Sequence, residues 1–242
     1  RIVRIVKQRY VIVLESKTPC FYNLRKRRTF NASQICLMFK VFFYPLFVLL
    51  ILNCSWAQTP LGSLLKDPKK LYKNANGPNT SLIQEVKKNG LIVVFSCNTC
   101  PFVVGSKHFP GWEKQYNELY DTSMKNKIGF LLVNSNEAKR GGDDAFDKME
   151  THAKKNKYKM AYLLDDNSSL ANELLAKTTP HVFFYNAQLE LIYSGSIDNI
   201  WDGKRKKEQY YLKDAIRSHV SSKKIKPNAT PPKGCSIKRV KP

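Results

Sequence analysis

Several features are scarce in this sequence of 242 residues, and each scarcity narrows what the chain can be. Six cysteines are too few for a small domain held together by disulfides, and 11 glycines exclude a collagen-like repeat. Acidic residues number 19 against 41 basic ones, a net charge of +22. The longest apolar run, at 41–52, falls short of the ~20 residues that span a bilayer comfortably. The length suits one domain of about 150 residues with additional segments, or two small domains.

The basic excess does not point to a nucleic-acid partner. Residues 1–57 hold 10 basic residues and 1 acidic residue, which leaves 31 basic and 18 acidic residues in 58–242. That remaining excess is spread over predicted helices, loops and the tail, and it forms no basic stripe interleaved with aromatic residues. We therefore expect no specific binding of nucleic acid.

The segment 38–57 has the pattern of a secretory signal peptide. Lys40 precedes the apolar run, and small residues lead up to Ala57. We expect cleavage after Ala57 and export to the periplasm or out of the cell. The alternative is an uncleaved anchor over 38–57, and only then would the protein be attached to a membrane.

Residues 1–37 begin with Arg1 and carry a basic cluster at 25–28. We interpret them as a non-native or untranslated extension upstream of a start at Met38, and a genuine basic arm is the alternative. Under the first interpretation the mature chain keeps only three of the six cysteines: Cys97, Cys100 and Cys235. Three thiols in an exported chain leave one outside any internal pair, and that thiol needs a role.

The rest of the chain is predicted to alternate strands and helices. We expect a linker at 58–80, a folded domain at 81–222 and a polar tail at 223–242. Apolar runs predict strands at 91–95, 128–133, 181–186 and 189–194, with a short edge element at 158–164. Helical spacings predict helices at 81–89, 102–120, 143–155, 168–177 and 208–221, with a kink or break at Pro110. This order indicates an α/β fold with a mixed central β-sheet flanked by helices.

The first predicted strand leads directly into a Cys-x-x-Cys motif. Cys97 and Cys100 lie between this strand and a predicted helix that opens at Pro101. Backbone N–H groups and the helix dipole stabilise a thiolate there, and so lower a thiol pKa that is ~8.5 in free cysteine. Pro suits the first helical turn because its missing N–H costs little. We therefore predict redox chemistry at this pair, with a permanent disulfide as the alternative.

A second part of the site is predicted at Thr179 and Pro180. A Pro directly before a strand is compatible with a cis peptide bond, which would bring a backbone edge beside the cysteine pair to receive an extended substrate. His181 is then a candidate for the lining of the substrate groove. No second Cys-x-x-Cys and no His-x-x-x-His motif follows, so we predict no metal site.

Five ordered segments resemble the thioredoxin-fold redoxin family, and its peroxiredoxin-like branch related to alkyl hydroperoxide reductase and thiol-specific antioxidant in particular. They are FSCNTCPFV, IGFLLVNSNEA, Thr179-Pro180 before HVFFYN, YSGSIDN and the ending GCSIK, which contains Cys235. The resemblance covers about residues 81–240. It implies a thioredoxin-like fold, a cis bond at Pro180 and thiol chemistry without a metal or organic cofactor. The implied partners are protein disulfides or dithiols, or peroxides, together with an external thiol reductant.

The sequence departs from both parent patterns, so two registers compete. The strand at 91–95 lacks the acidic residue that is usual in thioredoxins, and Cys97 stands where peroxiredoxins place Thr. In the thioredoxin register Cys97 attacks a substrate disulfide and Cys100 resolves the mixed disulfide. In the peroxiredoxin register Cys100 becomes a sulfenic acid and condenses with Cys97 or Cys235.

Two further alternatives stay open at this point. Cys235 is a free tail thiol, a partner for another chain, or the third member of a redox relay. The other alternative involves no catalysis: the protein is a binding module in which Cys97 and Cys100 form a static disulfide bridge. Resistance of that bridge to dithiothreitol would favour it.

Overall fold

A computed structural model of the chain describes residues 58–240. The predicted signal peptide at 38–57 and the extension at 1–37 lie outside these residues. No helix within 58–240 combines the length and the apolar character needed to cross a bilayer.

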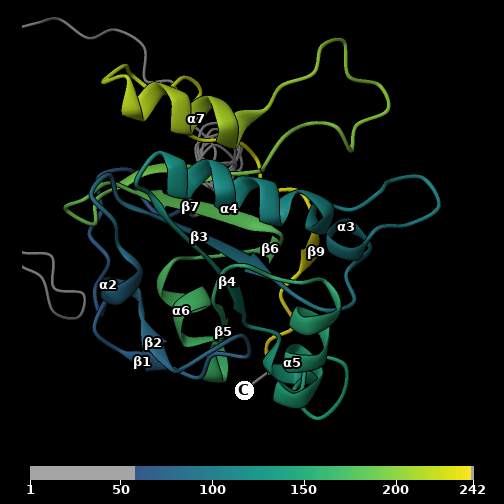
Figure 1. The fold of residues 1–242 in the computed structure, drawn as a ribbon. Helices are drawn as coiled ribbons and strands as arrows, with labels where there is room; N and C mark the ends of the chain where they lie inside the picture. The colour runs from purple at the N-terminus through teal and green to yellow at the C-terminus, as the bar shows by residue number, and fades with distance from the viewer. Residues whose placement is uncertain (1–57, 241–242) are drawn as a thin grey trace, which may run out of the picture. The chain divides into compact units, whose positions relative to one another are not determined.

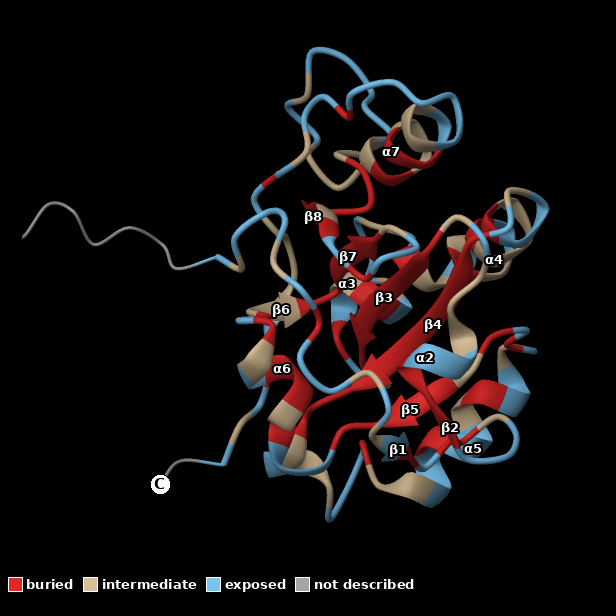
Figure 2. Ribbon diagram, turned by 90° about the vertical axis from the view of Figure 1, so that its left-hand side faces the viewer, coloured by how far each residue is buried: buried red, intermediate tan, exposed pale blue. Residues whose placement is uncertain are grey.

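A five-stranded mixed sheet forms the centre of the fold (Figure 1). Its strands are, in spatial order, β5 (Tyr162–Leu164), β4 (Gly129–Asn134), β3 (Leu91–Ser96), β7 (His181–Tyr185) and β8 (Leu191–Gly195). The first three run parallel, β7 is antiparallel to β3, and β8 is antiparallel to β7. The predicted strands thus form, and every residue of β3 and β4 is buried because both faces of the sheet are covered (Figure 2).

Short helices connect and cover the strands. They are α2 (Leu82–Glu85), α3 (Pro101–Val104), α4 (Tyr116–Lys125), α5 (Phe146–Lys155), α6 (Ser169–Glu173) and α7 (Tyr211–Val220), with 3₁₀ turns η1 (Trp112–Gln115), η2 (Glu137–Lys139) and η3 (Asp166–Ser168). Helices α4 and α7 lie on one face of the sheet, and α2 and α6 on the other (Figure 1). Alternate residues of β3 therefore enter two separate core clusters, Ile92 and Val94 on one side, Val93 and Phe95 on the other.

This connectivity defines a thioredoxin-like fold. The parallel unit from β3 to β4 is followed by an antiparallel hairpin, β7 and β8, and by the closing helix α7. The fold class predicted from the sequence is confirmed.

The helix predicted over 102–120 is wrong in its extent. Helix α3 is one turn long and ends at Gly105, whose φ of 103° is a conformation that glycine adopts easily. A loop follows, and the chain becomes helical again at η1 and α4. The expected break near Pro110 is present, but it removes the long helix whose dipole was expected to act on the cysteines.

The segments on both sides of the domain are also more ordered than expected. Residues 58–80, expected to be a linker, form the two-stranded pair β1 (Leu71–Tyr72) and β2 (Thr80–Ser81) and bury Leu65 and Tyr72 in the core. In the C-terminal segment, expected to be a flexible tail, Thr230 bonds to Ser194 of β8. Further along, β9 (Cys235–Ser236) pairs with β6 (Thr178–Thr179).

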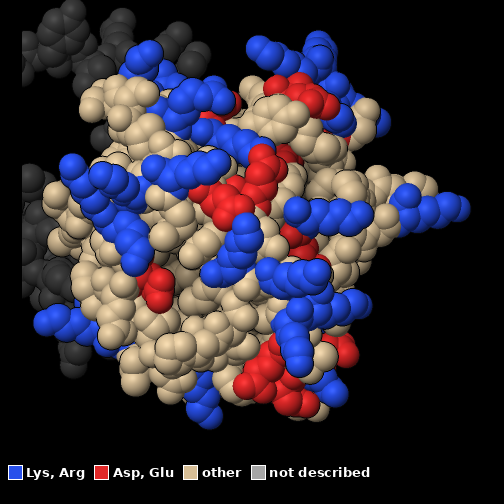
Figure 3. Space-filling view, viewed as in Figure 1, with Lys and Arg blue, Asp and Glu red and all other residues tan. Residues whose placement is uncertain are grey.

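Charge is distributed over the surface as the sequence indicates. Lys and Arg side chains occupy much of the face seen in Figure 3, with acidic groups among them. Several of these are exposed ion pairs, such as Lys159 with Asp121 at 2.6 Å and Lys139 with Asp143 at 3.3 Å. Such pairs contribute little to stability because water screens them.

Candidate active site

Three cysteines from two distant parts of the chain meet at the carboxyl end of β3. Cys97 follows β3 directly, Cys100 caps α3, and Cys235 opens β9. All three are free thiols. Cys97 and Cys100 are 2% and 4% exposed, whereas Cys235 is half-buried. The pair predicted from the sequence is therefore closed off from solvent, and Cys235 is the most exposed of the three residues.

Cys100 is the sulfur whose surroundings favour the thiolate. Hydrogen bonds from the Cys97 thiol, from the thiol and backbone N–H of Cys235, and from the backbone N–H of Phe102 lower the pKa of Cys100 to about 5, although burial opposes them. In its protonated form Cys100 donates instead to the carbonyl oxygen of Thr179 at 3.2 Å. The lowering comes first from a neighbouring thiol, and backbone N–H groups contribute less, in contrast to the helix-dipole argument.

Cys97 has the opposite tendency. Its hydrogen bond to Cys100, together with burial, raises the pKa of Cys97 well above the ordinary value of 9.0. The hydroxyl of Thr179, with Oγ1 at 3.1 Å from the Cys97 sulfur, partly offsets this effect. Cys97 is therefore the proton-bearing member of the pair, and it supplies the donor that stabilises the Cys100 thiolate.

Thr179 and Pro180 lie beside the cysteines, as predicted. The Thr179–Pro180 peptide bond is cis, which confirms that part of the prediction. Strand β6 presents both the hydroxyl and the carbonyl group of Thr179 to the two sulfurs. The backbone edge expected next to the cysteine pair is thus present.

His181 does not line a substrate groove, and this expectation is corrected. The residue is 3% exposed within β7, where its Nδ1 accepts from the backbone N–H of Lys177 at 3.2 Å and its Nε2 lies 3.3 Å from the Ser194 hydroxyl. Burial, followed by the charge of Lys177, lowers the pKa of His181 to about 3. A neutral ring with both nitrogens engaged has a structural role.

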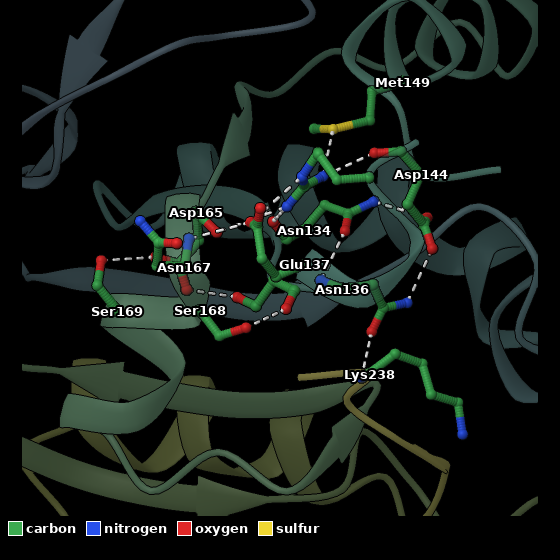
Figure 4. Close-up of polar contacts among 12 residues, drawn as sticks. Asn134, Asn136, Glu137, Asp144, Met149, Asp165, Asn167, Ser168, Ser169 and Lys238 are labelled. Carbon is green, nitrogen blue, oxygen red and sulfur yellow. Dashed lines mark hydrogen bonds and ion pairs between the residues drawn. The ribbon is translucent and has the colours of Figure 1, made fainter. Parts of the chain in front are cut away.

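A buried carboxylate, missed by the sequence analysis, supports the loop that carries Cys97. Asp144 is fully buried and accepts from the backbone N–H of Asn98 at 2.9 Å and from the side chains of Asn134 at 2.8 Å and Asn136 at 2.9 Å. Figure 4 shows Asn134, Asn136 and Asp144 converging at this point. The charge of Asp144 contributes to the raised pKa of Cys97.

The same network reaches the tail. The side-chain oxygen of Asn136 accepts from the backbone N–H of Lys238 at 2.9 Å (Figure 4), and the Ala138 N–H donates to the Lys238 carbonyl at 2.8 Å. Asp144 is therefore connected both to the residue after Cys97 and to the segment after Cys235. The only sequence signal was the polar Asn134-Ser135-Asn136 run after a buried strand, which reads equally well as an ordinary turn.

An aromatic and cationic cluster lies next to Cys100. The Lys233 ammonium stands 4.3 Å from the centre of the Trp201 ring and 5.5 Å from that of Phe102. Phe102 also stacks on Trp112, with ring centres 6.0 Å apart. The cluster ties the tail just before Cys235 to the helix just after Cys100. Lys107 and His108 fall within the helix predicted over 102–120, but they lie in the exposed loop after α3.

Comparisons with known proteins support the fold. No protein-family model and no curated protein matches the chain. An uncharacterized conserved protein from Geobacillus kaustophilus is 24% identical with a TM-score of 0.66, over 76% of this chain and 94% of that one. A hypothetical protein from Sinorhizobium meliloti is 24% identical with a TM-score of 0.67, over 77% and 98%. A peroxidoxin from Mycobacterium tuberculosis is 10% identical with a TM-score of 0.47, over 69% and 98%.

Fold and site together define a thioredoxin-fold protein in which two buried thiols and one partly exposed thiol lie at the end of β3. Solved structures that match the chain include peroxiredoxins and a disulfide oxidoreductase. At these identities the likeness concerns the fold, and the chemistry of this chain has to be argued from its own residues.

Proposed function

We propose that this protein is a thiol–disulfide oxidoreductase in which Cys97 and Cys100 form the redox pair. One observation carries the proposal: Cys97 and Cys100 lie as free thiols at the carboxyl end of β3, both in contact with Thr179 before the cis Pro180. The surroundings of Cys100 also lower its pKa to about 5, which favours the thiolate. The thiolate is the reactive form in disulfide exchange. A permanent structural disulfide would need no such stabilisation of one sulfur.

The lowered pKa of Cys100 favours this sulfur as the nucleophile, in the register opposite to that of thioredoxins. The Cys100 thiolate attacks one sulfur of a substrate disulfide, forms a mixed disulfide and expels the other substrate sulfur as a thiolate, which takes up a proton. Cys97 then gives up its proton and attacks the Cys100 sulfur, releasing the second substrate thiol. The substrate gains two electrons, Cys97 and Cys100 become a disulfide, and an external thiol reductant restores the pair.

The neighbouring residues have supporting roles in this proposal. The Thr179 hydroxyl supports the negative charge that develops on Cys97 during the second step, because it lowers the pKa of that thiol. Pro101 begins α3 directly after Cys100, where its missing N–H costs no helical hydrogen bond. Pro180 follows Thr179 and fixes the chain direction there.

Reduction of insulin by dithiothreitol tests the proposal. Cys97→Ser and Cys100→Ser are expected to lower turnover by at least ~100-fold, because either change removes one half of the disulfide. Lys107→Ala serves as a control near the motif, since that side chain is exposed and is expected to leave turnover unchanged. Circular dichroism establishes that each variant is folded. Unchanged turnover in both cysteine variants would refute the proposal.

A thiol-dependent peroxidase is the second candidate. Two observations favour it: the low pKa of Cys100 and the proline that follows this residue. The thiolate would take one oxygen from a peroxide and become a sulfenic acid, releasing an alcohol or water, and Cys97 or Cys235 would then condense with it and release water. Consumption of hydrogen peroxide, with a sulfenic acid trapped on Cys100, distinguishes this reaction from disulfide exchange.

Export of the protein is part of the proposal, and it depends on residues 38–57 alone. Free thiols that cycle through a disulfide suit an oxidising compartment, where partner proteins carry disulfides. Mass spectrometry of the protein produced by its own cells tests the point. A mature chain that begins at Gln58 supports cleavage, and a chain that retains 38–57 supports the anchored alternative.

A further inference from the structure

The backbone edge expected to receive a substrate is occupied by the protein's own tail. Strand β9 pairs antiparallel with β6, with Cys235 opposite Thr179 and Ser236 opposite Thr178. Thr179 is also the residue that contacts both Cys97 and Cys100. A cysteine in an extended strand therefore already lies where the cysteine of an extended protein substrate would approach the pair.

The tail is held in this place on both sides of Cys235. Before it, a Cβ atom on Gly234 would come within 2.3 Å of the Thr179 carbonyl oxygen, so that only glycine permits this approach. After it, Ile237 is buried in the core, and its N–H donates to the Lys177 carbonyl at 3.0 Å. The bonds of Lys238 to Asn136 and Ala138 complete the attachment. The segment 234–238 is therefore packed against the domain, and this packing fixes the position of Cys235.

The three sulfurs differ in accessibility in a way that orders them. Cys97 and Cys100 are almost completely buried, and Cys235 is partly exposed. Cys235 lies opposite Thr179 in the β6–β9 pair, and the carbonyl group of Thr179 accepts from the Cys100 thiol. The interaction with Cys235 also lowers the pKa of Cys100. Any external thiol or disulfide thus meets Cys235 first, and from Cys235 the next sulfur inward is Cys100.

We propose that Cys235 is the exchange thiol through which the buried pair reacts with external thiols and disulfides, and that β9 is a substrate built into the chain. The inference rests on the proposed function, because it assumes that Cys97 and Cys100 cycle. It adds that Cys235 in the tail reacts with external thiols and disulfides, whereas the proposed function does not say which cysteine does so.

Each step is a thiol–disulfide exchange. The Cys235 thiolate attacks the Cys100 sulfur of the Cys97–Cys100 disulfide, the bond between these two breaks, and Cys97 leaves and takes up a proton. An external thiolate then attacks the Cys235 sulfur and expels Cys100, the best leaving group because its thiolate is stabilised. A second external thiolate releases Cys235, so two external thiols become one disulfide. The reverse sequence reduces an external disulfide.

Disulfide mapping by mass spectrometry tests the arrangement. The protein is oxidised with one equivalent of glutathione disulfide and then mapped. Cys97→Ser is expected to accumulate an intramolecular Cys100–Cys235 disulfide, Cys100→Ser to carry glutathione on Cys235, and the wild-type protein to end with the Cys97–Cys100 disulfide. Cys235→Ser is expected to form the Cys97–Cys100 disulfide still, but to lose at least ~10-fold in insulin reduction, because the accessible sulfur is gone.

A glycine pair tests the placement of the strand without changing any sulfur. Gly234→Ala pushes the tail away from Thr179, so in a Cys97→Ser background it is expected to slow formation of the Cys100–Cys235 disulfide by about 10-fold. Gly203→Ala is the matched control, because a Cβ atom there meets nothing within 4 Å. Equal rates in the two variants would contradict the role of β9.

The outcomes separate this inference from the proposed function. If Cys235→Ser turns over like the wild type, or faster, while Cys97→Ser and Cys100→Ser are inactive, then external substrates reach the pair directly. The exchange role is then refuted, and the oxidoreductase stands. If the wild-type protein does not reduce insulin at all while Cys100–Cys235 forms in Cys97→Ser, the proposed function fails and the juxtaposition of the sulfurs is upheld.

Discussion

Two groups of buried ionisable residues lie at the ends of the parallel strands, the cysteines after β3 and two carboxylates after β4 and β5, and they are stabilised in different ways. After β3 come Cys97 and Cys100, whose interaction with each other raises the pKa of Cys97 and lowers that of Cys100. After β4 comes the polar run that surrounds Asp144, and the next strand, β5, leads to Asp165. Both carboxylates are completely buried.

The difference lies in the nature of the hydrogen-bond donors. Asp165 accepts from two hydroxyls, of Ser135 at 2.6 Å and Ser169 at 3.0 Å, and from the backbone N–H groups of Leu170 and Ala171. None of these donors can give up its proton in the physiological range, so the carboxylate is fixed and structural. The main donors to Cys100 are thiols that can themselves ionise or form a bond to it. A buried charge held by reactive donors is therefore poised for exchange.

The largest expected contrast is in the titration of the thiols. Ultraviolet absorbance of the thiolate is expected to rise with a midpoint near pH 5 for Cys100, whereas Cys97 ionises only well above 9.0 and Cys235 at about 11. Cys100→Ser should lack the acidic transition. Because the pKa of Cys100 is lowered in the folded protein, ionisation stabilises the fold above the ordinary thiol pKa, and this contribution is lost as pH falls through about 5. If all three thiols ionise in a single transition near pH 9, Cys100 does not differ from the other two.

The carboxylate side of the comparison is tested by Asp165→Ala. The change leaves the N–H groups at the start of α6 and the hydroxyls of Ser135 and Ser169 without their acceptor, and we expect a loss of about 3–5 kcal/mol in the free energy of unfolding. Urea unfolding measures it. The thiol titration of the folded fraction should be unchanged. A loss under about 1 kcal/mol would mean that water replaces the carboxylate.

Asp144→Asn acts on both regions. The variant keeps an oxygen for the Asn98 N–H but sets its amide nitrogen against that of Asn136, so a loss of about 1–3 kcal/mol in the free energy of unfolding is expected. Removal of the negative charge should also move the pKa of Cys97 downward. Asp143→Asn, an exposed neighbour, is the control for both measurements. If the pKa of Cys97 does not change, the charge of Asp144 does not act on the thiols, and the two regions are electrostatically independent.

The smallest effect is expected at the surface. Lys139 and Asp143 form an exposed ion pair at 3.3 Å next to the buried network. Lys139→Ala should change the free energy of unfolding by no more than about 0.5 kcal/mol, because water and salt screen such a pair. Urea unfolding at low and high salt measures the difference. A larger loss would mean that this exposed ion pair contributes to stability together with the buried network around Asp144.

Much of the fold was predictable because buried strands leave a plain signal. The runs 91–95 and 128–133 are continuously apolar, and the structure places β3 and β4 there with one-residue shifts at their ends. The helices were less well predicted. The spacing of Val103, Trp112 and Tyr116 fits one helix, but the loop between Gly105 and Gly111 brings those side chains into the same core without one.

The remaining errors have a common cause. Residues 58–80 were predicted to be a linker because they are polar and Lys-rich and contain Pro68 and Pro78, yet Leu65 and Tyr72 are buried in the core on one face of the sheet. His181 read as exposed to a groove because it follows Pro180, and the neighbouring strand β8 buries it. In each case the deciding contact comes from a segment that is distant in the chain.

The sequence by itself determined the class of fold and the position of Cys97 and Cys100 at the end of a buried strand, since both depend on local pattern. Only the tertiary structure decided which sulfur carries the negative charge and what Cys235 faces. A thiol pKa depends on the donors around the sulfur, and here Thr179, Asp144 and Cys235 come from separate segments that fold onto one strand end.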